Sequence, residues 1–269
     1  MTREEKVAAF RRLHVPGAPF VLPNPWDIGS ARVLGHLGAK ALATTSSGHA
    51  FTLGRRDMGR VSRDEALEHA ALIADATVLP VSGDFENGFG DDPDFVAETV
   101  RLAAAAGLAG VSIEDTEMPG GGAYAFDLAT ARIEAAVDAA RSAGIVLTAR
   151  ADGWLNRTYD GAEAVRRCTA FAEAGADVIY APLVRDDVAK EICRIGTPVN
   201  VLAAGRVAEH SVSSLGNMGV ARISTGGTLA RLAQRAVLEA GRQILGPDGD
   251  LSVLSQAAGL AEIDEMLAG

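Results

Sequence analysis

Three charged side chains each follow a short apolar run of the sequence, and their types suit the binding of a small acid. Asp84 and Glu114 are carboxylates, and Arg150 carries a guanidinium. Asp57 and Glu86 add two more carboxylates. Mg²⁺ prefers such oxygen ligands and keeps several waters besides one or two carboxylates. A guanidinium opposite them can hold a substrate carboxylate through two hydrogen bonds. These residues therefore indicate a small acid that chelates Mg²⁺ through a carboxylate and a neighbouring oxygen.

The elements that must position these residues are short apolar strands. At six places a helical segment ends, a glycine follows and a short apolar run comes next. Glycine adopts the left-handed conformation that stops a helix and turns the chain into a strand. The predicted strands are 20–22, 41–44, 78–81, 110–113, 145–148, 178–180, 199–202 and 220–223. They are apolar on both faces, as buried parallel strands are.

The segments between these runs are predicted to be helices. Ser62 with Glu65, for example, forms a capping box. Strands that alternate with helices in this number predict an α/β fold, a (β/α)8 TIM barrel, as a single domain over residues 1–269. A helix over 2–13 and helices after Pro247 are expected outside the barrel. A doubly wound open sheet is the alternative, but its G-x-G-x-x-G fingerprint is absent after the first run.

Polar residues at the carboxyl ends of barrel strands are candidates for substrate contact, because the active site of a barrel lies there. They include Trp26, Ser46, Ser47, Gly48 and Asn200. Trp26 fits either a pocket wall or the core, and Asn200 fits either a ligand contact or polar filling of the barrel. Solvated turns or internal salt bridges are the alternative explanation for the charged residues.

The composition narrows the classes of partner. Lys and Arg number 25 against 35 Asp and Glu, which gives a formal net charge of −10. Such a surface repels phosphate backbones and acidic lipids, so neither nucleic acid nor membrane is expected as a partner. Two cysteines cannot form a disulfide framework, and the charged N-terminus lacks the apolar region of a signal peptide. A cytoplasmic location is therefore expected.

Five motifs occur in order along the chain and together resemble the isocitrate lyase/phosphoenolpyruvate mutase superfamily. They are Asn24-Pro25-Trp26-Asp27, Thr45-Ser46-Ser47-Gly48, the D-x-E-x-G-x-G run from Asp84, Ile113-Glu114-Asp115 and Ala149-Arg150-Ala151-Asp152. The resemblance implies a barrel whose last helix packs on a neighbouring subunit in a homodimer or homotetramer. It also implies that Mg²⁺ holds an α-keto acid or its enolate while an adjacent C–C or P–C bond is made or broken.

The resemblance assigns a role to each candidate residue. Asp84 is similar to the direct Mg²⁺ ligand, Glu86 would act through metal-bound water, and Glu114 resembles the next acidic residue around the metal. Asp57 resembles a more distant carboxylate, and either Asp57 or a metal-bound water could serve as a base. The substrate side is formed by the Arg150 guanidinium, by backbone N–H groups of Ser46, Ser47 and Gly48, and by an aromatic wall at Trp26.

The loop over 116–124 departs from the family pattern. Family lyases carry a Lys-x-Cys-Gly-His motif there and the phosphonate enzymes an Asn, but this loop has no Cys, His, Lys or Asn. Its Tyr124 could donate a proton or could simply pack. Ser112 stands where the lyases have a His near the metal. Three glycines in the loop suit a hinged lid.

The combined expectation is a Mg²⁺-dependent lyase that cleaves a C–C bond of a small 2-oxo or 2-hydroxy carboxylic acid through a metal-stabilised enolate. Oxaloacetate-decarboxylase/hydrolase-like chemistry would not need the missing cysteine, and methylisocitrate-lyase-like chemistry is the related form. One alternative is a P–C bond enzyme of the phosphonopyruvate type. Another is a protein that binds an α-keto acid without turnover.

Overall fold

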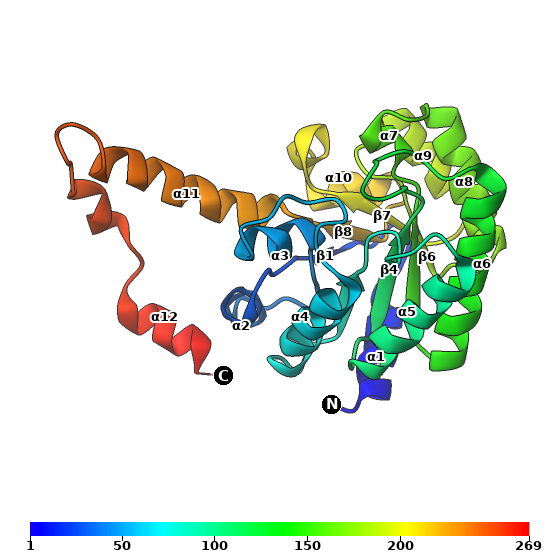
Figure 1. Cartoon of the computed structure of the whole chain (residues 1–269), viewed down its shortest axis with the longest axis horizontal. Coiled ribbons are helices and arrows are strands. Elements are labelled where there is room, and N and C mark those ends of the chain that lie inside the picture. The colour runs from blue at the N-terminus through cyan, green and yellow to red at the C-terminus, as the bar shows by residue number, and fades with distance from the viewer. Residues whose placement is uncertain (269) are drawn as a thin grey trace.

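The computed structural model describes residues 1–268 and contains eight parallel strands (Figure 1). The strands are β1 (Phe20–Leu22), β2 (Leu42–Ala43), β3 (Val81–Asp84), β4 (Gly110–Glu114), β5 (Val146–Arg150), β6 (Val178–Tyr180), β7 (Val199–Leu202) and β8 (Arg222–Ser224). They pair in the order β1-β8-β7-β6-β5-β4-β3-β2. Between β1 and β2 the backbone N–H of Ala43 donates to the carbonyl of Pro23 at 3.1 Å. The sheet is therefore a nearly closed barrel, which confirms the predicted fold class.

Helices follow the strands in the alternation expected from the sequence. They are α1 (Arg3–Leu13), α2 (Ile28–His36), α3 (Ser46–Thr52), α4 (Arg63–Asp75), α5 (Pro93–Ala105), α6 (Phe126–Ala143), α7 (Gly153–Asn156), α8 (Gly161–Glu173), α9 (Asp186–Cys193), α10 (Val212–Asn217), α11 (Thr228–Ile244) and α12 (Leu260–Leu267), with 3₁₀ turns η1 (Gly205–Glu209) and η2 (Ser252–Gln256). Gly144 ends α6 with a φ of 72°, a left-handed conformation that glycine adopts without strain. Local sequence signals thus set where the helices stop.

The strand register brings the candidate residues to neighbouring positions inside the barrel. Glu114 pairs with Arg150, and Arg150 pairs with Tyr180. Tyr180 pairs in turn with Asn200, and Asn200 pairs with Arg222. Residues paired across parallel strands point to the same face of the sheet. The barrel interior therefore carries a row of polar and charged side chains from β4 to β8.

Helix α1 packs against the barrel with aromatic contacts. Phe10 is fully buried and meets Phe20 edge to face, with ring centroids 6.3 Å apart. His14, just after α1, lies edge to face against both rings. The helix expected over 2–13 is therefore present, and it packs against β1.

Helix α11 leaves the barrel, and the chain returns toward α2 through α12 (Figure 1). Ala230 is the buried residue of α11, whereas Leu232, Val237 and Leu238 are 56%, 68% and 53% exposed. At its far end α12 is tied to α2, because Arg32 donates to the carbonyl of Leu267 at 2.9 Å. In residues 1–268 no helix is long and apolar enough to cross a membrane. Helix α11 thus carries large apolar side chains that residues 1–268 leave exposed.

Candidate active site

A cavity of about 420 Å³ lies inside the barrel, and every strand contributes to its lining. Its lining includes Ser46, Asp84, Arg150, Asn200 and Arg222. Barrel interiors are usually filled by branched apolar side chains, so this polar lining departs from the usual packing. A cavity with a few converging polar groups is the expected form of a small-molecule site. The volume suits a small organic acid.

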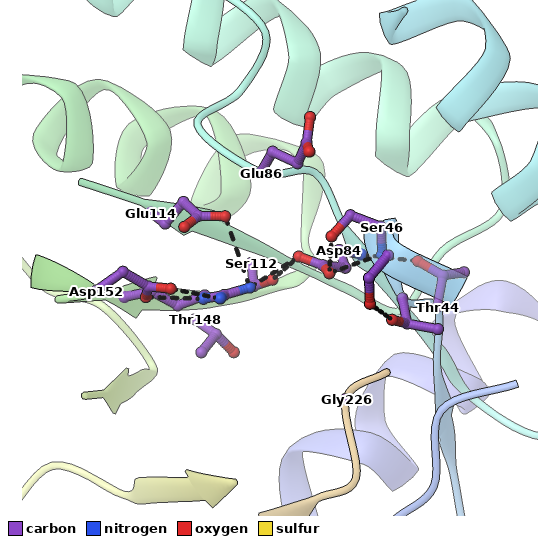
Figure 2. A network of polar contacts seen from close by, with 12 residues as sticks. Thr44, Ser46, Asp84, Glu86, Ser112, Glu114, Thr148, Asp152 and Gly226 are labelled. Atoms are coloured by element: carbon purple, nitrogen blue, oxygen red, sulfur yellow. Dashed lines mark hydrogen bonds and ion pairs between the residues drawn. The ribbon is translucent and has the colours of Figure 1, made fainter. Parts of the chain in front are cut away.

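Asp84 is held at the end of β3 by hydrogen bonds from three elements (Figure 2). Ser46 donates to one carboxylate oxygen through its backbone N–H and its hydroxyl, both at 2.9 Å. Arg150 donates to the other oxygen at 2.9 Å, and Ser112 lies 3.4 Å from it. The backbone N–H of Asp84 donates to the hydroxyl oxygen of Thr44 at 2.8 Å. The carboxylate predicted to bind the metal directly is therefore fixed in place and faces the cavity.

Arg150 lies at the centre of a cluster of carboxylates. It binds Asp152 through two hydrogen bonds, Nε to Oδ1 at 3.1 Å and Nη2 to Oδ2 at 2.6 Å. Its Nη1 also lies 3.8 Å from Glu114. These carboxylates, Asp152 foremost, outweigh burial and raise the pKa of Arg150 well above its usual value. Arg150 is therefore a permanent, oriented positive charge in the cavity.

Glu114 is 5% exposed at the end of β4 and accepts a hydrogen bond from Thr116 at 3.0 Å. Burial raises the pKa of Glu114 well above its usual value, although Arg150 acts in the opposite direction. Asp152 and Asp84 add to the rise by repulsion. A buried carboxylate in this setting gains most from an additional positive charge close by.

Glu86 has a strained backbone and an incompletely satisfied carboxylate. Its φ is 46°, a left-handed conformation that is uncommon for a residue with a side chain. One carboxylate oxygen accepts the N–H of Gly59 at 3.0 Å, while Oε2 is buried with no hydrogen-bond partner in the described residues. Burial raises the pKa of Glu86 to about 7, with repulsion from Asp84 and Asp57 adding to it. Figure 2 shows the side chain directed away from Asp84.

Asp57 also lines the cavity, and burial raises its pKa above the usual value. Asp84 raises it further by repulsion, while Arg150 and Ser46 act against the rise. Three carboxylates, Asp57, Asp84 and Glu86, therefore repel one another in one region. Mutual repulsion of this kind favours a bound cation.

The carboxylates fit a hydrated Mg²⁺ rather than a cage made of protein alone. In the part of the chain that is described, no three His, Cys, Asp or Glu side chains are arranged to hold a metal ion by themselves. Mg²⁺ commonly takes one or two carboxylates and keeps its waters, so Asp84 with more distant acidic groups is a suitable set. The unpartnered Oε2 of Glu86 is the kind of atom that such a water would satisfy.

We expect the metal-free protein to lose stability as pH rises, in part through Glu86. The pKa of Glu86 is about 7 in the folded state, above the ordinary value of 4.5, so the protonated side chain favours the folded state. This stabilisation is complete below pH 4.5 and is lost as the pH rises through 7. The effect is at most about 3 kcal/mol for one group. Thermal unfolding in EDTA at pH 5.5 and pH 8 measures it. Between pH 5.5 and pH 8 the melting temperature of Glu86→Gln should fall by less than that of the unsubstituted protein. An identical fall in both proteins would contradict the assignment.

The segment predicted to bind the substrate carboxylate begins α3. Ser46 and Ser47 line the cavity, whereas Gly48 lies behind them. A Cβ at Gly48 would meet Thr45 at 2.5 Å and Trp26 at 2.9 Å, so only glycine fits. Trp26 is not among the residues that line the cavity, and its carbonyl accepts from His69 at 2.8 Å. The structure thus brings the two serines to the site and places Gly48 and Trp26 in support of α3.

Asn200 lines the cavity beside a residue that the sequence analysis missed. Its Oδ1 accepts from Nε of Arg222 at 2.9 Å, and its Nδ2 donates to Ser224 at 2.9 Å. Arg222 is 3% exposed and also lines the cavity. A charged residue within the apolar run 220–223 was the available signal. Asp152 was likewise missed as a site residue, although it stands two positions after Arg150.

Tyr124 is not brought to the cavity. It is 2% exposed, and its hydroxyl donates to Asp91 and accepts from Asn87. Its ring lies under the guanidinium of Arg132 at 4.1 Å. Burial raises the pKa of Tyr124 to about 12, with the hydrogen bond to Asp91 adding to it. Of the two roles considered for Tyr124, the structure therefore supports packing, and the side chain does not line the cavity.

We expect Tyr124→Phe to reduce stability more than catalysis. The change removes a buried hydroxyl with two partners, which should lower the free energy of unfolding by about 1–3 kcal/mol. The cavity lining is unchanged, so kcat should stay within about 3-fold of the unsubstituted enzyme, far less than the 10²- to 10⁴-fold contribution of a general acid. Denaturant unfolding and steady-state kinetics measure the two effects. A 100-fold loss of kcat at unchanged stability would instead establish Tyr124 as a proton donor.

Comparison with known proteins gives consistent matches over most of the chain. A family model described as phosphoenolpyruvate phosphomutase matches residues 10–245. An uncharacterised protein of Mycobacterium tuberculosis strain H37Rv is 35% identical over 221 residues, which are 81% of this chain and 81% of that protein. The 2,3-dimethylmalate lyase of Eubacterium barkeri is 33% identical over 168 residues, covering 60% of this chain and 57% of that enzyme.

A solved structure is similar over nearly the whole chain. It is the crystal structure of a candidate lyase/mutase from Burkholderia cenocepacia J2315, with a TM-score of 0.93 and 42% sequence identity. The match covers 99% of this chain and 97% of that one. The similarity therefore extends beyond the barrel to the C-terminal elements.

Proposed function

The chain belongs to the phosphoenolpyruvate phosphomutase family, within the isocitrate lyase/phosphoenolpyruvate mutase superfamily that its motifs predict, and on this premise we propose that it is a Mg²⁺-dependent carbon–carbon lyase. Its substrate is a small 2-oxo or 2-hydroxy carboxylic acid, cleaved next to the oxygen-bearing carbon. The observation that carries the proposal is the Asp84–Arg150 pair, which joins a carboxylate and an oriented cation in one polar cavity.

In such a reaction the charged residues would have separate roles. Asp84, Glu86 and Glu114 would hold the metal ion, with Glu86 acting through water. When bound, Mg²⁺ supplies Lewis-acid stabilisation of the negative charge that develops on the substrate oxygen. Arg150 adds a fixed positive charge that needs no reorganisation during the reaction. Asp152 keeps the guanidinium oriented through its two hydrogen bonds.

Asp57 is the residue that we assign to proton transfer. It lines the cavity, and its raised pKa brings it closer to neutral pH, where a base both accepts and releases a proton efficiently. For a 2-hydroxy acid Asp57 would take the hydroxyl proton as that carbon becomes a carbonyl. The electron pair of the broken C–C bond would leave as an enolate on the other fragment, which water then protonates. Ser47 would orient the substrate carboxylate from the start of α3, while Ser46 positions Asp84 through its two hydrogen bonds.

Turnover of a defined substrate panel tests the proposal. The purified enzyme with Mg²⁺ is incubated with oxaloacetate, 2-methylisocitrate, 2,3-dimethylmalate and phosphonopyruvate, and products are identified by NMR. We expect C–C cleavage of an oxo or hydroxy acid that stops with EDTA. Turnover that persists in EDTA would contradict the metal requirement. Turnover of phosphonopyruvate alone would replace the proposal with P–C chemistry, and binding without turnover would indicate a binding protein.

We also propose that the exposed helix α11 packs on another copy of this chain. Leu232, Val237 and Leu238 point to different sides of α11, and each is more than half exposed among the described residues. Large apolar side chains that are exposed together on one segment are a common feature of association surfaces. A homodimer or homotetramer would bury them and would place a neighbouring subunit beside each barrel.

Light scattering coupled to size-exclusion chromatography tests this packing. The unsubstituted protein should elute at two or four times the chain mass of 27.8 kDa. Val237→Glu would bury a charge in the interface, so it should shift the protein toward the single-chain mass. Glu239→Gln on the same helix alters an exposed ion pair with Arg235 and should leave the mass unchanged. An unsubstituted protein at the single-chain mass would contradict the proposal.

A further inference from the structure

Arg222 is a buried guanidinium without a carboxylate partner. It is 3% exposed in β8 and lines the same cavity as Arg150. Arg150 has three carboxylates within 4.0 Å, but in residues 1–268 Arg222 forms no ion pair at that distance. A buried charge with no opposite charge nearby carries a large desolvation cost. Its position in the cavity suggests that the opposite charge arrives with a ligand.

The hydrogen bonds of Arg222 fix its orientation across the barrel. Its Nη1 lies 3.2 Å from Nε2 of His14, and its Nη2 donates to Thr148 at 3.0 Å. His14 must donate its Nδ1–H to the carbonyl of Phe10 at 2.9 Å, which leaves Nε2 to accept from Arg222. Burial lowers the pKa of His14 to about 3, with repulsion from Arg222 adding to it, so the ring is neutral. The Arg222 guanidinium therefore has no carboxylate partner in the described residues and is held in place by His14, directly after α1.

The same hydrogen bonds orient Asn200. Because a guanidinium only donates, Oδ1 of Asn200 must face Nε of Arg222, and its NH₂ group faces Ser224. Three of the five N–H groups of Arg222 are engaged, which leaves one on each Nη nitrogen. This side of the cavity thus offers hydrogen-bond donors and a positive charge.

The two sides of the cavity differ in charge. On the side formed by the ends of β2 to β5, Asp57 and Asp84 line the cavity, and Glu86, Glu114 and Asp152 lie behind them near Arg150. The side formed by β7, β8 and the start of α11 carries Arg222 and Arg231. No described carboxylate pairs with either of these two arginines. A ligand with a metal-chelating end and a second anionic end matches both sides.

We propose that Arg222, together with Asn200, forms a subsite for a second carboxylate and selects 2-oxo or 2-hydroxy acids that carry one. The inference rests on the proposed function, which places the oxo-acid end of the substrate beside Asp84 and Arg150. The second carboxylate then lies toward β7 and β8, where it supplies the charge that Arg222 lacks. Arg222 is a specificity-determining residue in this account, and the bond-breaking chemistry stays on the opposite side of the cavity.

Paired ligands that differ in one carboxylate test this subsite. Calorimetry in Mg²⁺ compares 2-oxoglutarate with 2-oxopentanoate, and oxaloacetate with 2-oxobutyrate; for a pair that is turned over, kcat/KM replaces Kd. We expect the dicarboxylate of at least one pair to be favoured by about 10-fold or more, as for a charge-assisted contact. Arg222→Met should reduce that preference to about 2-fold, while Arg222→Lys should retain part of it.

Asn200→Asp provides a second variant that keeps the packing. It places a carboxylate beside Nε of Arg222, so the arginine stays in place but its positive charge is paired. It should abolish the preference for dicarboxylates while the Mg²⁺-dependent Kd for oxalate stays within about 3-fold, because oxalate occupies only the metal side. An unsubstituted protein without the preference, or an unaltered preference in folded Arg222→Met and Asn200→Asp, would overturn the subsite. Loss of Mg²⁺-dependent oxalate binding in the unsubstituted protein would instead overturn the proposed function.

Discussion

Replacing Asp84 with Asn should abolish Mg²⁺-dependent turnover while the barrel stays folded. The change removes the negative charge that would bind the metal and keeps the size of the side chain, although its single amide oxygen can accept from Ser46 or from Arg150 but not from both. Because a metal ion contributes several kcal/mol to stabilising developing charge, kcat should fall by about 10³-fold or more. Steady-state kinetics over a range of Mg²⁺ concentrations measure the loss. Added metal should not restore the rate.

Asp138→Asn is the matched control for this prediction. Asp138 pairs with Arg141 on the exposed face of α6, with 80% of its side chain exposed. The same chemical change there should leave the rate and the metal dependence unaltered, since exposed pairs contribute little. If Asp84→Asn retained Mg²⁺-dependent turnover near the unsubstituted rate, Asp84 would not be a metal ligand.

Replacing Arg150 with Met should affect both stability and catalysis. The change leaves the buried Glu114 and Asp152 and the partly buried Asp84 without the cation that they share. Removing one partner of a buried ion pair lowers the free energy of unfolding by about 3–5 kcal/mol. The site also loses the charge aimed at the developing oxyanion, so kcat should fall by about 10²- to 10³-fold even in molecules that are folded. Urea unfolding and kinetics on the folded fraction separate the two effects.

Mg²⁺ should restore part of the stability of Arg150→Met, because the ion supplies positive charge to the same carboxylates. Arg235→Met is the control, since Arg235 forms an exposed pair with Glu239 and should change stability by less than about 1 kcal/mol. A stable Arg150→Met protein with a normal rate would show that the buried cluster does not depend on this cation.

The sequence predicted the barrel because each local signal agreed with the overall fold. Glycines stop helices before apolar runs, and the run at 145–148 is followed by Arg150 at the end of β5. Position at a strand end is a local property, so Asp84, Glu114 and Arg150 could be selected as site residues without the structure. What a strand end does not specify is which partner a side chain meets across the barrel.

Arg222 and Tyr124 both illustrate that limit. Arg222 lines the cavity but was not selected from the sequence, whereas Tyr124 was selected but does not line it. Arg222 lies in an apolar run, and its contacts with Thr148 and His14 depend on the closure of the barrel and the position of α1. Tyr124 lies on the expected loop, but its backbone N–H donates to the carbonyl of Asp115 at 2.9 Å and the side chain packs toward Asp91. Tertiary contacts between distant segments decide both cases, and a single sequence carries no pattern for them.

Calorimetric titration of oxalate into the purified protein tests the central claim most directly. Oxalate resembles the enolate of pyruvate in size and charge, so a site made of a divalent ion and Arg150 should bind it in preference to pyruvate. We expect tight binding in Mg²⁺ that is lost in EDTA and in Asp84→Asn, but not in Asp138→Asn. Binding of equal affinity with and without Mg²⁺, or no binding in either condition, would contradict a metal-dependent site for a developing enolate in this cavity.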